Sequence, residues 1–264
     1  MPIQSSTASD RRIEPPPSMS HLAAVALRSM ILAGELRPGD RVVENQLTET
    51  LGVSKPPLRE AMRVLEQEGL IVRTPRRGAV VTPLTLHDVY EIFTLRHSLE
   101  RLAIDLGVPS RSPARVARCR DAYAALARAA EDGDAAAVTE RGFAFHLAVV
   151  GLAGHRRIED AYRALALQLQ LCMGMNRQAR RSRETLLGDA LRHRRILELI
   201  EGGDTEGLRR ELVHHGDKTF LLDADHNFPG GSPESLAWLE SVRRLAEAHD
   251  GTTAGSRGDG RPGG

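Results

Sequence analysis

The sequence predicts a mainly α-helical protein, in which three helices and a β-hairpin precede a bundle of six to seven helices. Only 3% of the 264 residues are aromatic, whereas β-sheets are enriched in aromatic and β-branched residues. Apolar residues recur at helical spacing along most of the chain. One pair of short β-branched runs, at residues 70–72 and 79–81, stands alone and predicts a single hairpin.

Composition divides the chain into five segments. Residues 1–18 are polar and proline-rich and residues 250–264 are glycine-rich, so neither can bury enough apolar surface to fold, and both are expected to be disordered. Residues 19–83 are expected to form the first domain and residues 84–228 the helical second domain. Residues 229–249 are expected to contain one extra helix, which begins at Pro233.

Charge and cysteine content narrow the class of protein. The formal net charge is +1, so any surface that binds nucleic acid must be local. Cys119 and Cys172 have no metal-type spacing and are expected to be reduced, buried thiols. The chain contains no unbroken run of about 20 apolar residues and no signal-like segment. A cytoplasmic protein without a membrane partner is therefore expected.

Residues 47–61 have the pattern of a helix-turn-helix. Gly52 permits a tight turn between two helices, and Ser54 is placed to cap the second one. Pro56 and Pro57 are tolerated in its first turn because the amides there have no helical partner. The buried face of this helix is expected to consist of Leu58, Ala61, Met62 and Leu65.

The start and outer face of the same helix are left exposed and basic. Such a helix suits the major groove of double-stranded DNA, because its free amides and cationic side chains meet phosphates and base edges there. The hairpin that follows has a basic tip, as expected for the wing of a winged helix. The alternative is a helix-turn-helix that contacts only proteins. The predicted DNA-binding residues are Ser54, Lys55, Pro56, Pro57, Arg59, Arg63, Arg73, Arg76, Arg77 and Gly78.

This first domain carries an ordered set of motifs: Ile31 with Gly34, Pro38-Gly39, Leu47, Leu51-Gly52-Val53-Ser54, Pro57-Leu58-Arg59-Glu60-Ala61, Leu65, Glu68-Gly69-Leu70, and Arg77-Gly78 with Val80. The combination resembles the GntR family of bacterial transcription regulators. The resemblance implies operator contacts along the start of the second helix of the motif, and adds Asn45 to the DNA-binding residues. It also implies that Glu60 orients Arg59 rather than touching DNA.

Four polar residues of the second domain lie on the apolar faces of four different predicted helices. They are Arg96, His146, His193 and His215. Because each buried polar group needs a partner, a shared internal cavity that holds a metal ion, water or an anion would satisfy all four. Imidazoles suit zinc- or nickel-type ions, and a fixed arginine suits a carboxylate.

The second domain also carries a motif set: Leu95-Arg96 with Leu99-Glu100 and Ala103, Phe145-His146 before Leu152-Ala153-Gly154, His193 with Ile196-Leu197 and Ile200, then Asp204 and His215. These pieces resemble the FadR-type, or FCD, subfamily of GntR regulators. The resemblance implies a domain that forms homodimers and binds a small organic acid, such as a carboxylate or sugar acid. The predicted effector-binding residues are Arg96, Glu100, His146, His193 and His215.

The resemblance also implies a divalent metal site, with one departure. Metal-binding members have an aspartate one turn before the first of three histidines, and here that position is Gly142. His146, His193 and His215 can still bind a zinc- or nickel-type ion, with water or effector completing the coordination. The alternative is a metal-free pocket in which histidine and arginine bind the acid directly.

These inferences predict a DNA-binding transcriptional regulator controlled by a small molecule. The rival class is an enzyme with a catalytic zinc at the histidines. The sequence has no nucleophile elbow, phosphate loop or HExxH helix, and no general base beside the cluster, so no enzymatic activity is expected.

Overall fold

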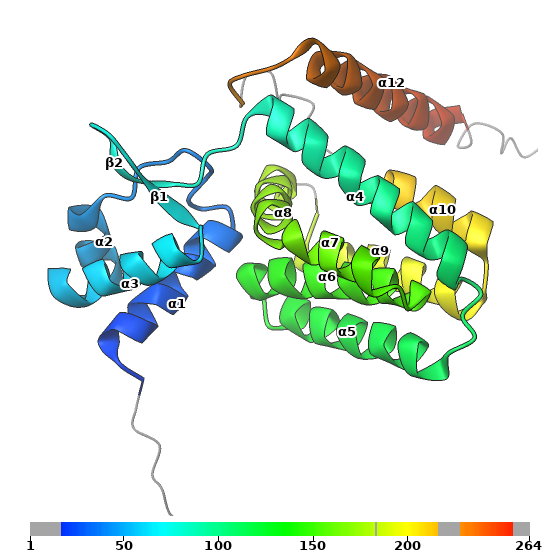
Figure 1. The fold of residues 1–264 in the computed structure, drawn as a ribbon, viewed down its shortest axis with the longest axis horizontal. Coiled ribbons are helices and arrows are strands. Elements are labelled where there is room, and N and C mark those ends of the chain that lie inside the picture. Colours follow the sequence, from blue (N-terminus) through cyan, green and yellow to red (C-terminus); the bar gives the residue numbers. More distant parts are fainter. Residues whose placement is uncertain (1–16, 183, 216–227, 256–264) are drawn as a thin grey trace, which may run out of the picture.

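The N-terminal domain has the predicted three helices and two-stranded hairpin (Figure 1). The computed structural model describes residues 17–182, 184–215 and 228–255. Strands β1 and β2 are antiparallel, with Ile71 opposite Val81 and Thr74 opposite Gly78. The bounds are α1 (Met19–Leu32), α2 (Glu44–Leu51), α3 (Lys55–Gln67), β1 (Ile71–Thr74) and β2 (Gly78–Val81).

The helix-turn-helix forms as the sequence predicts. Gly52 follows α2 in the left-handed region, with φ of 64°, and α3 begins immediately after Ser54 with prolines in its first turn. Ser54 occupies the N-cap position, but its side chain makes no capping hydrogen bond. The expected cap is therefore absent, which leaves the hydroxyl of Ser54 exposed. The predicted inner face of α3 is buried in full: Leu58, Ala61, Met62 and Leu65.

The tip of the wing is a tight turn between β1 and β2. The amide of Arg77 donates to the carbonyl of Thr74 at 3.2 Å, and Arg76 has a φ of 65°. Proline at the second position and a positive φ at the third are the features of a type II turn. The turn points the side chains of Arg76 and Arg77 into solvent.

The second domain is the helical bundle that the sequence predicts, and α6 lies at its centre (Figure 1). Helix α6 contacts α4, α5, α8 and α9. Asp134 caps it, its side chain accepting the amide of Ala137 at 2.9 Å. The bundle helices are α4 (Leu86–Gly107), α5 (Pro113–Glu131), α6 (Ala135–Val150), α7 (Arg156–Ala164), α8 (Ala166–Arg180), α9 (Leu186–Glu201) and α10 (Thr205–His214), with a short 3-10 turn at Gly151–Ala153.

One described stretch, Ala135–Ala153, is long and apolar enough by length and composition to cross a membrane. It carries Glu140 and Arg141, so its apolar run is not continuous. Its window is 61% buried inside the structure, because it consists of α6 and the turn after it. A core helix of a bundle has these properties.

The C-terminal helix α12 (Pro233–Gly255) packs against α4 (Figure 1). The ring of Trp238 meets that of Tyr90 edge-on at 5.8 Å, and Leu239 is buried. Helix α12 continues to Gly255, into the segment 250–264 that was expected to be disordered. Residues 1–16 of the expected leader, the end of the expected second domain at 216–227, and residues 256–264 lie outside the described residues.

The two domains meet where α1 packs against α6 and α8. The hydroxyl of Thr139, on α6, donates to the carbonyl of Leu32, the last residue of α1, at 2.9 Å. Cys119 and Cys172 are both free and buried within the bundle, and burial raises the pKa of each thiol to about 12. The expectation of two buried thiols is therefore confirmed.

Candidate functional site

The three predicted histidines come together in the core of the bundle. His146 comes from α6 and His193 from α9, and His215 directly follows α10. Each is at most 5% exposed, and one ring nitrogen from each lies within 4.8 Å of the others. The Nε2 atoms of His193 and His215 are 3.3 Å apart. This cluster has the donor set and the spacing of a site that could hold a metal ion.

Burial keeps these imidazoles neutral. It lowers the pKa of His193 to about 3 and lowers the pKa of His146 and His215, which also lie beside other cationic or imidazole groups. The Nδ1 of His193 lies 2.8 Å from the carbonyl oxygen of Asp189, to which it donates. Its Nε2 is then left with a lone pair toward His215, and a neutral imidazole with a fixed tautomer is the form that binds metal.

Arg96 and Glu100 lie behind His146 as a buried ion pair. The Nε of Arg96 donates to Glu100 at 2.9 Å, and the hydroxyl of Tyr162 donates to the same oxygen at 2.8 Å. Although burial alone would raise it, the charge of Arg96 holds the pKa of the Glu100 carboxyl well below its usual range. The Nη2 of Arg96 is 3.2 Å from the ring of His146. Glu100 also contacts the histidine directly, with its Oε1 3.1 Å from the Nδ1 of His146, so both members of the pair fix this ring.

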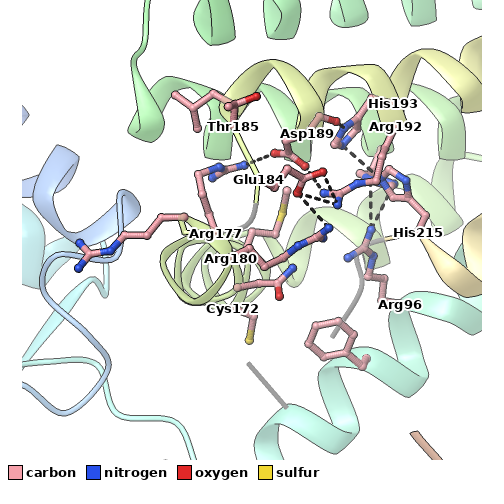
Figure 2. Close-up of a pocket in the computed structure, with 16 residues that line it drawn as sticks. Arg96, Cys172, Arg177, Arg180, Glu184, Thr185, Asp189, Arg192, His193 and His215 are labelled. Atoms are coloured by element: carbon pink, nitrogen blue, oxygen red, sulfur yellow. Dashed lines mark hydrogen bonds and ion pairs between the residues drawn. The ribbon is translucent and has the colours of Figure 1, made fainter. Parts of the chain in front are cut away.

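A cavity of about 250 Å³ opens beside the histidines (Figure 2). Arg96, His193 and His215 lie toward one end with Arg192 of α9, and Arg180 and Arg177 of α8 extend away from them. Five arginines and two carboxylates line it, so arginines outnumber acids by two even when Glu100 is added. The arginines are Arg96, Arg177, Arg180, Arg181 and Arg192, and the carboxylates are Glu184 and Asp189.

Four buried atoms of the lining have no hydrogen-bond partner among the described residues. They are the Nε of Arg177, the Nε of Arg192, the Oδ1 of Asn176 and the Nδ1 of His215. A buried polar atom without a partner is costly, so each of these needs a bound ligand or solvent. Two of the four are guanidinium N–H groups, which favour an anion.

Gly142 faces the histidines. A Cβ at this position would lie 3.8 Å from the Nε2 of His193 and 2.9 Å from the terminal methyl of Met173. The position is therefore the one from which a carboxylate would join the cluster, and the flexible end of Met173 fills that space instead. The three imidazoles fit a zinc- or nickel-type ion, without a carboxylate to neutralise its charge.

The predicted DNA-binding residues lie on one exposed side of the N-terminal domain. All are exposed except Pro57, which is partly buried. Lys55, Arg76 and Arg77 make no ion pair with any described residue, whereas three other arginines do. These pairs are Arg59 with Glu44 at 3.0 Å, Arg63 with Glu60 at 3.2 Å and Arg73 with Glu66 at 3.2 Å.

The expected role of Glu60 is wrong. Glu60 does not orient Arg59, because adjacent residues on a helix point in different directions. It pairs instead with Arg63, three residues further along α3, while Arg59 is held by Glu44 from the first turn of α2. A contact between two helices, which the local sequence pattern does not contain, decides this pairing.

Sequence reasoning did not find Arg177, Arg192, Asp189 or Tyr162. Helical periodicity singles out a polar residue on an apolar face, but the two arginines lie on partly buried, polar faces of α8 and α9. The chain holds 36 lysines and arginines, so composition alone does not indicate which of them line a cavity. The one local indication was that Arg192 directly precedes His193, which was predicted to be part of the site.

A winged helix-turn-helix with an exposed basic helix, joined to a helical bundle with a cationic pocket, is the architecture of a DNA-binding regulator. Comparison with family models agrees. The model described as "Bacterial regulatory proteins, gntR family" matches residues 21–81, and the FCD domain matches residues 91–218. The chain belongs to the GntR family of bacterial transcription regulators and carries an FCD domain.

Individual relatives support the same assignment. The HTH-type transcriptional regulator YdhC of Bacillus subtilis is 29% identical over 204 residues, which are 76% of this chain and 87% of that protein. A protein of Paenarthrobacter nicotinovorans named "Probable D-xylose utilization operon transcriptional repressor" is 30% identical over 186 residues, which are 70% and 80% of the two chains. These relatives are regulators and not enzymes, so the predicted class is confirmed.

Two solved structures share the fold. The regulator McbR/YncC of Escherichia coli aligns with a TM-score of 0.52 at 22% identity, over 80% of this chain and 99% of that one. A GntR-type regulator from Rhodococcus sp. RHA1 aligns with a TM-score of 0.53 at 25% identity, over 80% and 97%. The fold of this chain is therefore one that solved structures of regulators share.

Proposed function

We propose that this protein is a cytoplasmic, homodimeric regulator whose binding to operator DNA is controlled by a small organic acid, a carboxylate or sugar acid, bound in the cavity of the FCD domain. The observation that carries the proposal is the excess of arginine over carboxylate in that cavity, with unpartnered guanidinium nitrogens of Arg177 and Arg192. An arginine is the side chain best suited to bind a carboxylate with two parallel hydrogen bonds.

Arg96 and the histidines form the inner end of this binding site. Arg96 is held by Glu100, so it presents a fixed positive charge and keeps His146 in place. The neutral histidines can donate or accept hydrogen bonds to hydroxyl and carboxylate groups. A polar acid that carries hydroxyl groups would therefore find partners along the full length of the cavity.

The same histidines would hold the divalent metal ion, which is of the zinc or nickel type. When bound, the ion supplies a positive centre for the carboxylate of the effector. His193 is oriented for this role by the carbonyl of Asp189, and Met173 occupies the place beside Gly142 where a carboxylate ligand would otherwise enter.

DNA binding is assigned to the exposed side of the N-terminal domain. The start of α3, with Lys55 and Arg59, would enter the major groove, and Arg76 of the wing would contact phosphate or the minor groove. A homodimer would present two such domains to the two halves of a palindromic operator. Three exposed leucines on α4 support dimerisation through this helix: Leu95, Leu102 and Leu106.

Isothermal titration with citrate and gluconate tests the proposed effector class. Binding of an acid to the wild-type protein should weaken about tenfold or more in Arg192→Ala, because a hydrogen bond to a charged group is lost. Arg195→Ala is the matched control, since this exposed arginine of α9 lies outside the cavity and pairs with Glu198. If neither acid bound the wild type, or if the acid bound Arg192→Ala as tightly as the wild type, the proposed effector class would be excluded.

Two further measurements test the metal and the dimer. Elemental analysis of untagged wild-type protein, purified without chelator, should detect the metal, and the His193→Ala variant should contain none. A metal-free wild type would mean that the histidines bind only the acid.

The double substitution Leu102→Glu, Leu106→Glu should convert a dimer into a monomer in size-exclusion chromatography with light scattering. A wild-type monomer, or a dimer that survives both charges, would exclude α4 as the interface.

A further inference from the structure

Helix α8 touches the effector cavity on one side and the DNA-binding domain on the other. Met173 and Asn176 line the cavity, Gly174 packs against the end of α1, and Arg177, one turn after Gly174, lies between these two faces. A Cβ on Gly174 would lie 2.6 Å from the carbonyl oxygen of Leu32, and one on Gly34 would lie 2.6 Å from the carbonyl oxygen of Gly174. The two backbones are therefore in direct contact, which only residues without a side chain permit.

The last carbonyl of α1 depends on the other domain for its hydrogen bond. The preceding carbonyls, of Ser29, Met30 and Ile31, accept amides from the residues that follow the helix. The carbonyl of Leu32 accepts the hydroxyl of Thr139, which is fully buried on α6. The Thr139 hydroxyl has a second acceptor, the carbonyl of Ala135, at 3.2 Å. Because a hydroxyl donates one hydrogen, it has two alternative arrangements.

Arg177 favours the arrangement that holds the DNA-binding domain. Its Nη1 donates to the hydroxyl oxygen of Thr139 and, at 3.4 Å, to the carbonyl of Ala135. Both contacts direct the hydrogen of Thr139 toward Leu32, because Arg177 takes the lone pair of the hydroxyl and occupies the competing carbonyl. Only 12% of the Arg177 side chain is exposed, so solvent offers little alternative.

The opposite edge of the same guanidinium faces the cavity. Its Nη2 donates to Asp189 at 2.8 Å, while its Nε has no partner among the described residues. The Nε and Nη2 groups of an arginine lie on one edge and bind a carboxylate together. An acid in the cavity can therefore offer Arg177 two hydrogen bonds where Asp189 offers it one.

We propose that Arg177 is the residue through which an acidic effector acts on the DNA-binding domain. The acid binds its Nε–Nη2 edge in place of Asp189 and draws the guanidinium away from Thr139. The Thr139 hydroxyl then turns to Ala135, and the carbonyl of Leu32 loses the bond that holds α1. This inference rests on the proposed function, and it adds the route by which occupancy of the cavity alters DNA binding. The effector acts because it binds the two arrangements unequally.

Hydrogen–deuterium exchange tests the link without any ligand. Thr139→Val removes the hydroxyl at nearly constant volume, and Arg177→Gln removes the charge. Each should speed exchange of the amides at residues 33–36 by about threefold or more, and the double variant should do no more than either single one. Thr139→Ser keeps the hydroxyl and should exchange like the wild type. Thr94→Val is a further control, because the Thr94 hydroxyl bonds only within α4.

Exchange at residues 33–36 that is unchanged in both single variants, or that adds up in the double one, would overturn the proposal. Either result would mean that Arg177 and Thr139 do not act in series on α1. Two different substitutions are used so that a failure of one to fold leaves the other decisive.

DNA binding separates this inference from the proposed function. The probes are citrate and a duplex that the wild-type protein selects from random sequence. Thr139→Val should bind citrate at least as tightly as the wild type, since Arg177 no longer has to leave the Thr139 hydroxyl, but its DNA affinity should no longer respond to citrate. A full response in Thr139→Val overturns the route and leaves the effector function standing. Citrate that does not bind the wild type counts against the effector class, while the exchange experiment still decides the route.

Discussion

The proposed DNA-binding surface and the proposed effector cavity use the same residue types in opposite ways. On the surface, Arg59 pairs with Glu44 while its side chain is 60% exposed. In the bundle, Arg96 pairs with Glu100, and the two side chains are 6% and 2% exposed. An exposed pair contributes between 0 and about 1 kcal/mol, whereas a buried charge that loses its partner costs several times more.

The difference between exposed and buried ion pairs suits the two proposed tasks, which are DNA binding and effector binding. The surface arginines can exchange a carboxylate for a DNA phosphate at little cost, because water already screens both partners. The buried pair cannot exchange partners so cheaply, and it acts as a fixed support for His146. Arg177 lies between these extremes, since it is mostly buried but holds one edge open to the cavity.

The largest expected effect comes from breaking the buried pair. Glu100→Gln keeps the shape of the side chain but leaves Arg96 charged and without a counter-ion, in a site that Tyr162 also closes. We expect the free energy of unfolding, measured with urea, to fall by about 3–5 kcal/mol. Glu60→Gln breaks the exposed pair with Arg63 and should change it by less than about 0.5 kcal/mol. Equal losses in the two variants would refute the contrast between buried and exposed pairs.

The next effect concerns DNA. Arg59→Ala should weaken binding to the selected duplex by about 1–3 kcal/mol and relax the preference at one base position, if Arg59 leaves Glu44 to contact a base. Arg194→Ala is the control, because Arg194 forms a comparably exposed pair with Glu198 on α9 and is not part of the predicted DNA surface. Fluorescence anisotropy measures both, and an equal loss in the two variants would place Arg59 outside the interface.

The fold class and the convergence of the histidines could be predicted from the sequence. The fold class followed from periodicity, because apolar spacing marks helices and one isolated pair of β-branched runs marks the wing. The convergence of His146, His193 and His215 followed as well, because a polar residue on an apolar face must be buried and must find a partner.

The remaining contacts depend on how helices pack, which local patterns do not contain. Glu44 reaches Arg59 from another helix, so the role that the family resemblance implied for Glu60 was wrong. Arg177 was missed because it lies on a polar face, and its function comes from neighbours on α6 and α9. Thr139 gave no signal, since one threonine in an apolar helix is common and its role depends on the end of α1.

A third prediction concerns a substitution that adds a negative charge to the buried histidine site. Gly142→Asp places a carboxylate beside His193, and the flexible end of Met173 can move to admit it. We expect zinc or nickel to bind about 10- to 100-fold more tightly, the size of effect that ligand-supporting groups have at metal sites. Competition with a coloured chelator measures the affinity. Gly142→Asn adds the same volume without the charge and should bind metal as the wild type does. If Gly142→Asn raised the metal affinity as much as Gly142→Asp, the result would contradict this explanation.

The smallest expected effect concerns the wing, where the charges are the most exposed. Arg76 makes no ion pair with any described residue, and the turn at the tip holds it away from the domain. If Arg76 contacts phosphate rather than the minor groove, Arg76→Ala should weaken binding to all duplexes by a similar small factor. The slope of log affinity against log salt concentration should fall by about one, because one fewer counter-ion is released. A loss confined to one sequence, with the salt slope unchanged, would instead make Arg76 a base-reading residue and would move specificity from α3 to the wing.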